Sequence, residues 1–240
     1  MADYTKSELF TEFSKVDNFR FFYQHKIINY RGPRSSTKEK YTEIAAEWVI
    51  DHIENFQQIP PIQRNKTYYS KSHNGKSKNP DAVSEKQTAI KMYNQGIISG
   101  AGEILDYQTP LKNKQIDKVG EIDVLAFDKD KKILRILELK IPNSSETMLR
   151  CVLEAYTYLK TVDGQKLIRD FNRDGNANIP ENTPIVACPF VFRYMSDGKD
   201  GLQYIEMQED RPKLKKLMEL LEIKPLYIEG IEGHYTASEL

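Results

Sequence analysis

The stretch GEIDVLAFDKDKKILRILELKIP, residues 120–142, decides the fold. Two segments dominated by apolar residues flank a charged turn at 128–132, which is the pattern of a β-hairpin with an exposed turn. Side chains alternate between the two faces of a strand, so Glu138 and Lys140 share a face with the apolar residues before them. The opposite face is apolar as well. We therefore predict that this strand is covered on both sides.

The first strand of the hairpin carries a matching acidic residue, Asp123. If Asp128 pairs with Ile133 across the turn, Asp123 falls opposite Glu138. A slip by one residue would put the two carboxylates on different faces of the sheet. This register predicts that Asp123, Glu138 and Lys140 meet at one end of a buried sheet.

Asp123, Glu138 and Lys140 are residue types that suit a metal-dependent phosphodiesterase. Two adjacent buried carboxylates repel each other unless a cation intervenes. Mg²⁺ prefers oxygen ligands, is often held by one or two carboxylates, and can be replaced by Mn²⁺. We predict that all three residues are catalytic, with Lys140 orienting the attacking water. The plainer alternative is a Glu138–Lys140 ion pair without a catalytic role.

Apolar periodicity and capping residues predict further elements around the hairpin. An apolar stripe at helical spacing runs from Tyr41 to Phe56, after a Ser36–Glu39 pair that fits a capping box. The run at 183–194 is typical of a buried strand. The other expected elements are a helix at 84–96, strands at 102–112, 120–128 and 133–142, a helix at 145–160, a loop rich in Asn, Asp and Gly before 183–194, a strand at 202–208, a helix carrying Leu214, Leu217, Met218 and Leu221, and a strand at 225–230.

Residues 62–82 are polar, with almost no aliphatic side chains, and predict a loop. One interpretation is a solvated linker. The other is a nucleic-acid-binding strip, in which basic side chains contact phosphates and tyrosines stack on bases. The candidate nucleic-acid-binding residues are Arg64, Lys66, Tyr68, Tyr69, Lys71, Lys76 and Lys78.

In this order of elements and residues the chain resembles the PD-(D/E)XK nuclease superfamily, over roughly residues 83–194. Asp123 matches the family's metal-binding aspartate, and Glu138-Leu139-Lys140 matches its ExK element. The proline of the family's name is absent, because an isoleucine precedes Asp123. The resemblance implies an α/β, restriction-endonuclease-like three-layer core, in which a central mixed sheet is flanked by helices.

The resemblance also implies roles for neighbouring residues. Mg²⁺ would be held by Asp123, Glu138 and the carbonyl of Leu139, with help from Glu85 on the preceding helix. RecB-like members carry Gln-x-x-x-Tyr on the helix that follows, where this chain has Glu154 and Tyr158. These two residues lie one helical turn apart and are expected to support the site.

Composition excludes several function classes. The chain has 240 residues, and its 35 basic side chains balance 35 acidic ones, so net charge gives no argument for nucleic-acid binding. Its four histidines are scattered, which excludes a histidine metal site or a Ser-His-Asp hydrolase. Cys151 and Cys188 lack CxxC spacing and are expected to be small core residues. No apolar run predicts a membrane span or signal peptide, so we expect no membrane association and a cytoplasmic location.

The expected organisation is a helical N-terminal region with the basic loop (1–82), a nuclease core (83–200) and a C-terminal extension packed on the core (201–240). The expected function is Mg²⁺-dependent hydrolysis of nucleic acid, with DNA as the partner. Two alternatives stay open, namely a catalytically silent nucleic-acid-binding or assembly protein that keeps the fold, and a phosphohydrolase of small nucleotides. Endonuclease against exonuclease action and a homodimer are also left open.

Overall fold

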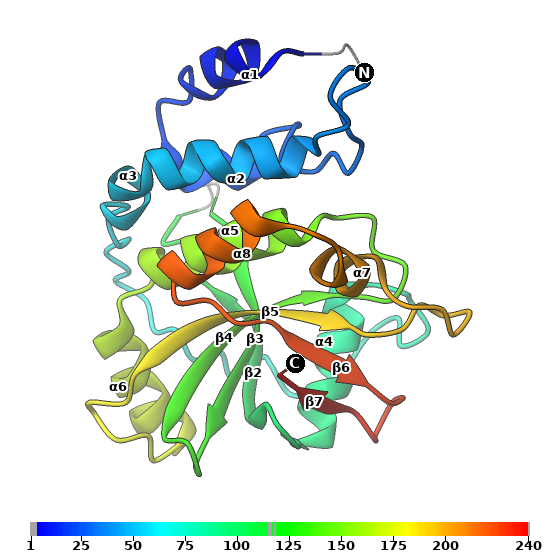
Figure 1. Ribbon diagram of the computed structural model, residues 1–240. Coiled ribbons are helices and arrows are strands. Elements are labelled where there is room, and N and C mark those ends of the chain that lie inside the picture. The colour runs from blue at the N-terminus through cyan, green and yellow to red at the C-terminus, as the bar shows by residue number, and fades with distance from the viewer. Residues whose placement is uncertain (1–3, 115–116, 118, 240) are drawn as a thin grey trace.

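A mixed sheet of seven strands organises the chain (Figure 1). The computed structural model describes residues 4–114, 117 and 119–239. The strands lie side by side in chain order, with β1 to β4 antiparallel, β4, β5 and β6 parallel, and β7 antiparallel to β6. Their bounds are β1 Ile97–Ile98, β2 Gly102–Pro110, β3 Glu121–Asp128, β4 Ile133–Lys140, β5 Ile185–Phe192, β6 Leu226–Glu229 and β7 Thr236–Ser238.

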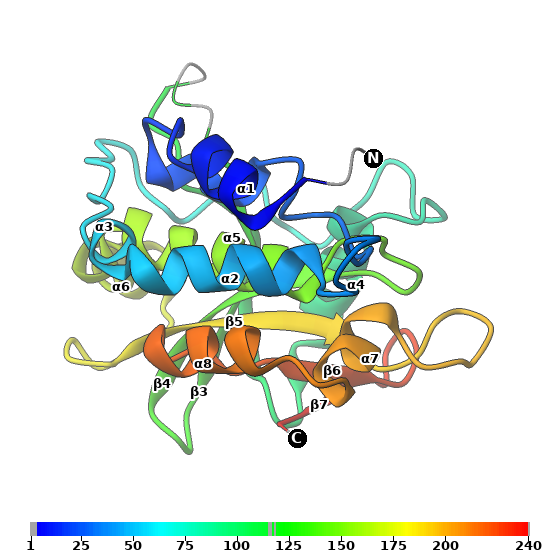
Figure 2. The same ribbon diagram turned by 45° about the horizontal axis from the view of Figure 1, so that its top comes forward.

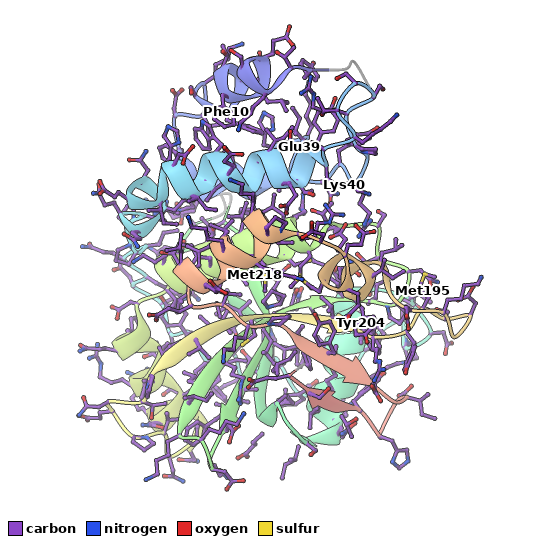
Figure 3. The ribbon with its side chains drawn as sticks, in the orientation of Figure 1. Phe10, Glu39, Lys40, Met195, Tyr204 and Met218 are labelled. Atoms are coloured by element: carbon purple, nitrogen blue, oxygen red, sulfur yellow. The ribbon has the colours of Figure 1, made fainter. Side chains whose placement is uncertain are left out.

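Helices cover both faces of this sheet, which confirms the α/β class. The helix α4 packs on one face, and α5 and α6 pack on the other. Figure 1 and Figure 2 show α2 lying over α5 and α8, with α1 stacked outside it as a further layer. In Figure 3, Phe10 points from α1 toward α2, and Met218 points from α8 toward the sheet. The helices are α1 Lys6–Phe13, the 3₁₀-helix η1 Phe19–Gln24, α2 Tyr41–Asp51, α3 Ile53–Gln57, α4 Glu85–Gln95, α5 Met148–Thr161, α6 Gly164–Gly175, α7 Leu202–Gln208 and α8 Pro212–Leu220.

The sheet curls around α4 until its two edges touch. Ser99, beside β1, forms a parallel bridge with Thr236 of β7, and the amide of Ala237 donates to the carbonyl of Ser99 at 2.8 Å. Gly100 permits this contact, because a Cβ there would lie 1.8 Å from the carbonyl oxygen of Ala237. The contact joins the two edge strands of the sheet at this junction.

The predicted hairpin register and the predicted strands and helices of the central segment are confirmed. Asp128 pairs with Ile133 in the β3–β4 hairpin, which is the register that sets Asp123 opposite Glu138. The helix at 84–96 is α4, whose Ser84 hydroxyl accepts from the amide of Gln87. The strands expected at 102–112, 120–128, 133–142, 183–194 and 225–230 correspond to β2, β3, β4, β5 and β6, and the expected helices at 145–160 and around Leu214 are α5 and α8.

The helix predicted after Ser36 is α2, and it begins only at Tyr41. The predicted Ser36–Glu39 capping box is therefore wrong. Residues 33–40 form a tight turn closed by a bridge between Pro33 and Lys40, with Lys38 at φ 61°. Lys40 is therefore the N-cap of α2, and it makes no side-chain cap. The helix is also interrupted at His52, which separates α2 from α3.

The segment between α5 and β5 contains a helix, α6, instead of the continuous loop that was predicted. Asp163 caps it by accepting a hydrogen bond from the amide of Lys166 at 3.0 Å. Its few apolar residues, Leu167, Ile168 and Phe171, lie on one face and are buried. Tertiary packing of this narrow stripe overrides the low helix propensity of the surrounding Asn, Asp and Gly.

The strand predicted at 202–208 is wrong, because these residues form the helix α7. Gln203 and Glu206 are buried and lie three residues apart, on one helical face. Glu206 accepts from the amide of Met148 at 2.6 Å and thereby satisfies the amino end of α5. The buried hydrogen bonds of Gln203 and Glu206 therefore favour a helix here, although the alternation of apolar residues is typical of a strand.

Cys151 and Cys188 are buried free thiols in α5 and β5, as expected. Within residues 4–114, 117 and 119–239, no helix has the length and apolar character that crossing a bilayer requires.

Replacing Gly100 by Ala should destabilise the protein by more than about 3 kcal/mol, because a side chain at φ 83° is strained and its Cβ meets the Ala237 carbonyl. Gly198 is the matched control, since it has nearly the same φ (82°) and open space around it. Gly198→Ala should cost only about 1 kcal/mol, the strain alone. Denaturant unfolding of both variants measures the difference, and equal losses would contradict the close contact.

Candidate active site

A cavity of about 490 Å³ lies where the carboxyl end of β4 meets the amino ends of α4 and α5. Its lining carries six acidic and four basic side chains among fourteen residues. The acidic residues are Glu85, Glu121, Asp123, Glu138, Glu146 and Glu154, and the basic residues are Lys86, Lys112, Lys140 and Arg150; Ser84, Gln108, Gly120 and Tyr158 complete the lining.

Asp123 is held from two strands. One of its carboxylate oxygens accepts from the backbone amide of Leu139 at 3.0 Å, and the other accepts from Nε2 of Gln108 at 3.0 Å. Gln108 has φ 51°, which is a strained conformation for a residue with a side chain. The side chain of Asp123 therefore has a defined orientation next to the ExK segment.

Lys140 lies among carboxylates from three segments of the chain. Its Nζ is 2.7 Å from Glu138, 3.1 Å from Glu85 and 3.1 Å from Glu146. Glu154 lies further away, at 3.9 Å. The lysine side chain is only 4% exposed, so these contacts are made in a largely dehydrated setting.

Negative charge exceeds positive charge at the centre of the cavity. Burial raises the pKa of Asp123 to about 7, and Lys140 offsets this only in part. Burial also raises the pKa of Glu138, and the neighbouring charge of Asp123 raises it further. Burial opposes the charge of Lys140, but the carboxylates, led by Glu138, outweigh it and raise the lysine pKa well above its usual value. A further cation near Asp123 and Glu138 would relieve this imbalance.

The donor atoms fit a hard divalent cation. Oε2 of Glu138 is buried and has no hydrogen-bond partner among the described residues. Oε2 of Glu154 is also buried without a hydrogen bond there, and its cationic neighbours Lys140 and Arg150 lie at 3.9 Å and 3.7 Å. Buried carboxylate oxygens without partners are costly unless a cation or water meets them. In the described part of the chain, no group of three or more His, Cys, Asp and Glu side chains is already arranged as a metal site. Lys140 occupies the centre of the carboxylates instead.

Glu154 and Tyr158 both line the cavity, one turn apart on α5. The Tyr158 hydroxyl donates to Oε1 of Glu154 at 2.9 Å, which orients this carboxylate toward Lys140 and Arg150. A Cβ at Gly120 would lie 2.1 Å from the Tyr158 hydroxyl, so the start of β3 packs tightly against the tyrosine.

Several lining residues were missed in the sequence, and among them Gln108, Glu146 and Arg150 contact residues that were predicted. A signal existed for two of them, because Glu146, Arg150 and Glu154 follow one another at a spacing of four, which brings charges together on a helix. The Arg150 Nε lies 3.0 Å from Glu146 and 3.7 Å from Glu154. No pattern marks Gln108, whose role depends on a local backbone conformation.

The basic loop is placed differently from the other predicted site residues, because none of its seven candidates lines the cavity. Tyr68 is fully buried, so its predicted role in base stacking is wrong. The guanidinium of Arg64 is turned inward, donating to the carbonyls of Thr67 and Lys112, and is not free for phosphate. Tyr69 packs edge-on against Phe171. The exposed candidates are Lys66, Lys71, Lys76 and Lys78.

Comparisons with known proteins add no identity to this site. The chain matches no protein-family model, no curated protein and no solved structure.

Asp123→Asn should stabilise the metal-free protein at about pH 8 by roughly 1–3 kcal/mol. The folded protein keeps a proton on Asp123 up to a pKa of about 7, whereas the unfolded chain releases it near the usual 3.8. Metal-free stability therefore falls as pH rises through this window, and asparagine removes the loss. The gain should vanish near pH 4. Denaturant unfolding in EDTA across this pH range measures it.

Asp128→Asn is the matched control, since Asp128 is a buried aspartate at the other end of β3. Burial there is outweighed by the amide of Lys131 and the guanidinium of Arg135, which lower the pKa of Asp128. Its stabilisation is present above the usual aspartate pKa and is lost as pH falls. Asp128→Asn should thus destabilise at about pH 8, and the same sign for both variants would contradict the electrostatic description of the cavity.

Proposed function

We propose that this protein is a metal-dependent nuclease with a restriction-endonuclease-like core of the PD-(D/E)XK type, and that it hydrolyses phosphodiester bonds in DNA. The observation that carries the proposal is the juxtaposition of Asp123, Glu138 and Lys140, with the amide of Leu139 bonded to Asp123. A buried excess of carboxylates in the lining of a cavity is costly for stability. Such a cost is typical of functional sites.

Asp123, Glu138 and the carbonyl of Leu139 are the proposed ligands of Mg²⁺ or Mn²⁺, with Glu85 in support. The unpartnered Oε2 of Glu138 is the clearest candidate donor atom. A bound divalent cation supplies charge neutralisation at the carboxylates and Lewis acidity at the phosphate. Gln108 and the Leu139 amide hold the Asp123 carboxylate in place for this role.

Lys140 acts as a permanent cation in the proposed reaction. Because the surrounding carboxylates raise its pKa, its ammonium group stays protonated and donates hydrogen bonds. It can orient the attacking water and stabilise the negative charge that develops on the phosphate oxygens. The side chain is attached next to Leu139, so its position is tied to the same strand that supplies Glu138.

Further lysines provide the remaining contacts in this proposal. Lys86 and Lys112 line the cavity and lie beside the proposed catalytic residues. The exposed lysines of residues 62–82 are candidates for contacts with more distant phosphates. The neutral net charge of the chain makes such local groups the expected source of affinity.

The ion pairs of Lys140 favour a second candidate, a nucleic-acid-binding protein without turnover. A lysine held by four carboxylates is less available to a substrate than a free one. The cleavage assay distinguishes the two functions.

Lys140→Met should lower metal-dependent DNA cleavage by about 100-fold or more, because the cation at the phosphate is lost while the aliphatic stem is kept. Lys166→Met is the control, since Lys166 pairs with the buried Asp170 on α6 and does not line the cavity. Plasmid and single-stranded DNA are incubated with Mg²⁺, Mn²⁺ or EDTA. Equal cleavage by both variants, or none by folded wild-type protein, would refute the proposed activity.

Mg²⁺ or Mn²⁺ at saturation should stabilise the wild-type protein by about 2–3 kcal/mol, because a cation that binds only the folded state shifts the unfolding equilibrium. Asp123→Asn and Glu138→Gln should lose most of this stabilisation, whereas Asp128→Asn should keep it. Thermal unfolding at increasing metal concentration measures the effect. A shift of equal size in all four proteins would show that the cation binds elsewhere.

A further inference from the structure

Two cations lie side by side in the cavity and share their anionic partners. Lys140 projects from the end of β4 and Arg150 from the first turns of α5. Glu146 bridges them, with Oε2 at 3.1 Å from the lysine Nζ and Oε1 at 3.0 Å from the arginine Nε. A single carboxylate thus uses one oxygen for each cation, as two oxygens of a phosphate group would.

Glu146 is held less firmly than the other carboxylate between these cations, Glu154. The Glu154 side chain is 10% exposed and is fixed by the hydroxyl of Tyr158, whereas the Glu146 side chain is 24% exposed. The Nε of Arg150 and the Oε2 of Glu146 are also buried without a hydrogen bond of good geometry to any described residue. The Glu146 carboxylate is therefore the partner that a competing anion displaces most easily.

The backbone that carries Glu146 is anchored independently of its side chain. The carbonyl of Glu146 accepts from Nε2 of Gln203 on α7 at 2.6 Å, and Arg31 donates to the carbonyls of Ser145 and Glu146. The carboxylate of Glu206 on α7 accepts a hydrogen bond from the amide of Met148, two residues after Glu146. The carboxylate can turn away from the cations without unfolding this loop.

We infer that Lys140 and Arg150 together form a binding site for a phosphate group of the substrate, and that the carboxylate of Glu146 occupies this site in the resting protein. The inference rests on the proposed function, because a nucleic acid supplies such phosphates. It assigns Arg150 to substrate binding and Glu146 to an autoinhibitory contact. Arg150 suits this role because its planar guanidinium donates two parallel hydrogen bonds to phosphate oxygens.

The test is a titration of the full chain with inorganic phosphate in EDTA, in which isothermal titration calorimetry measures the affinity. Glu146→Gln should bind phosphate about 10-fold more tightly than wild type, because the competing anion is removed and its shape is kept. Arg150→Met should bind about 10-fold more weakly. The double variant, which removes one charge of each sign and so keeps the local balance, should lose the gain of Glu146→Gln.

Glu121→Gln is the matched control. Glu121 lines the same cavity but pairs with Lys112 at 3.3 Å, and its neutralisation should change phosphate affinity by less than about twofold. Equal tightening by Glu121→Gln and Glu146→Gln would overturn the inference, since the effect would then come only from the net charge of the cavity. No change in Glu146→Gln would overturn it as well.

The titration requires no cleavage and no metal, so its outcome is separate from that of the proposed function. The expected pattern in a protein that cuts no DNA would support the phosphate site and contradict the nuclease. Metal-dependent cleavage by a protein in which all four variants bind phosphate like wild type would support the nuclease and overturn the phosphate site.

Discussion

The contact between Lys140 and the carboxylates around it is the interaction on which the rest of the structure depends. Glu138 is 2% exposed, and a carboxylate so deeply buried is tolerated only with a cation beside it. The lysine in turn gathers Glu85 from the start of α4 and Glu146 from the segment before α5. The ionic cluster thereby joins elements that cover opposite faces of the sheet.

This cluster is not optimised for stability. Burial raises the pKa of Asp123 and Glu138, so the charged forms of these carboxyl groups destabilise the metal-free folded state near neutral pH. Replacing a buried ionic cluster by well-packed apolar residues often costs nothing or stabilises a protein. The persistence of the cluster at a cavity, together with the strained backbone of Gln108, therefore supports a functional reason for it.

Structure remote from the cavity serves to position it. The N-terminal region contributes Arg31, which pairs with Glu206 at 2.7 Å and also contacts the segment before α5. The helix α7, from the C-terminal region, satisfies the amino end of α5. Residues before and after the central segment thus fix the start of the helix that carries Arg150 and Glu154.

The sequence by itself determined the central hairpin, its register and the three residues at its end. Strand alternation has a period of two, and the charged turn marks where the chain reverses, so local information is enough to propose the pairing that brings Asp123, Glu138 and Lys140 together. The structure confirms this register. The helices α4 and α5 could also be predicted from the sequence, because their caps and apolar stripes are local features.

Tertiary structure alone decided the helices α6 and α7, the burial of Tyr68, and the joining of β1 to β7. It also decided the place of Gln108 in the cavity. Partners distant in the chain are part of this, as when the amide of Met148 donates to Glu206 or the amide of Tyr68 donates to Asp170. Sequence patterns record periodicity within one element, whereas the free energy of burying a polar group depends on which distant partner satisfies it.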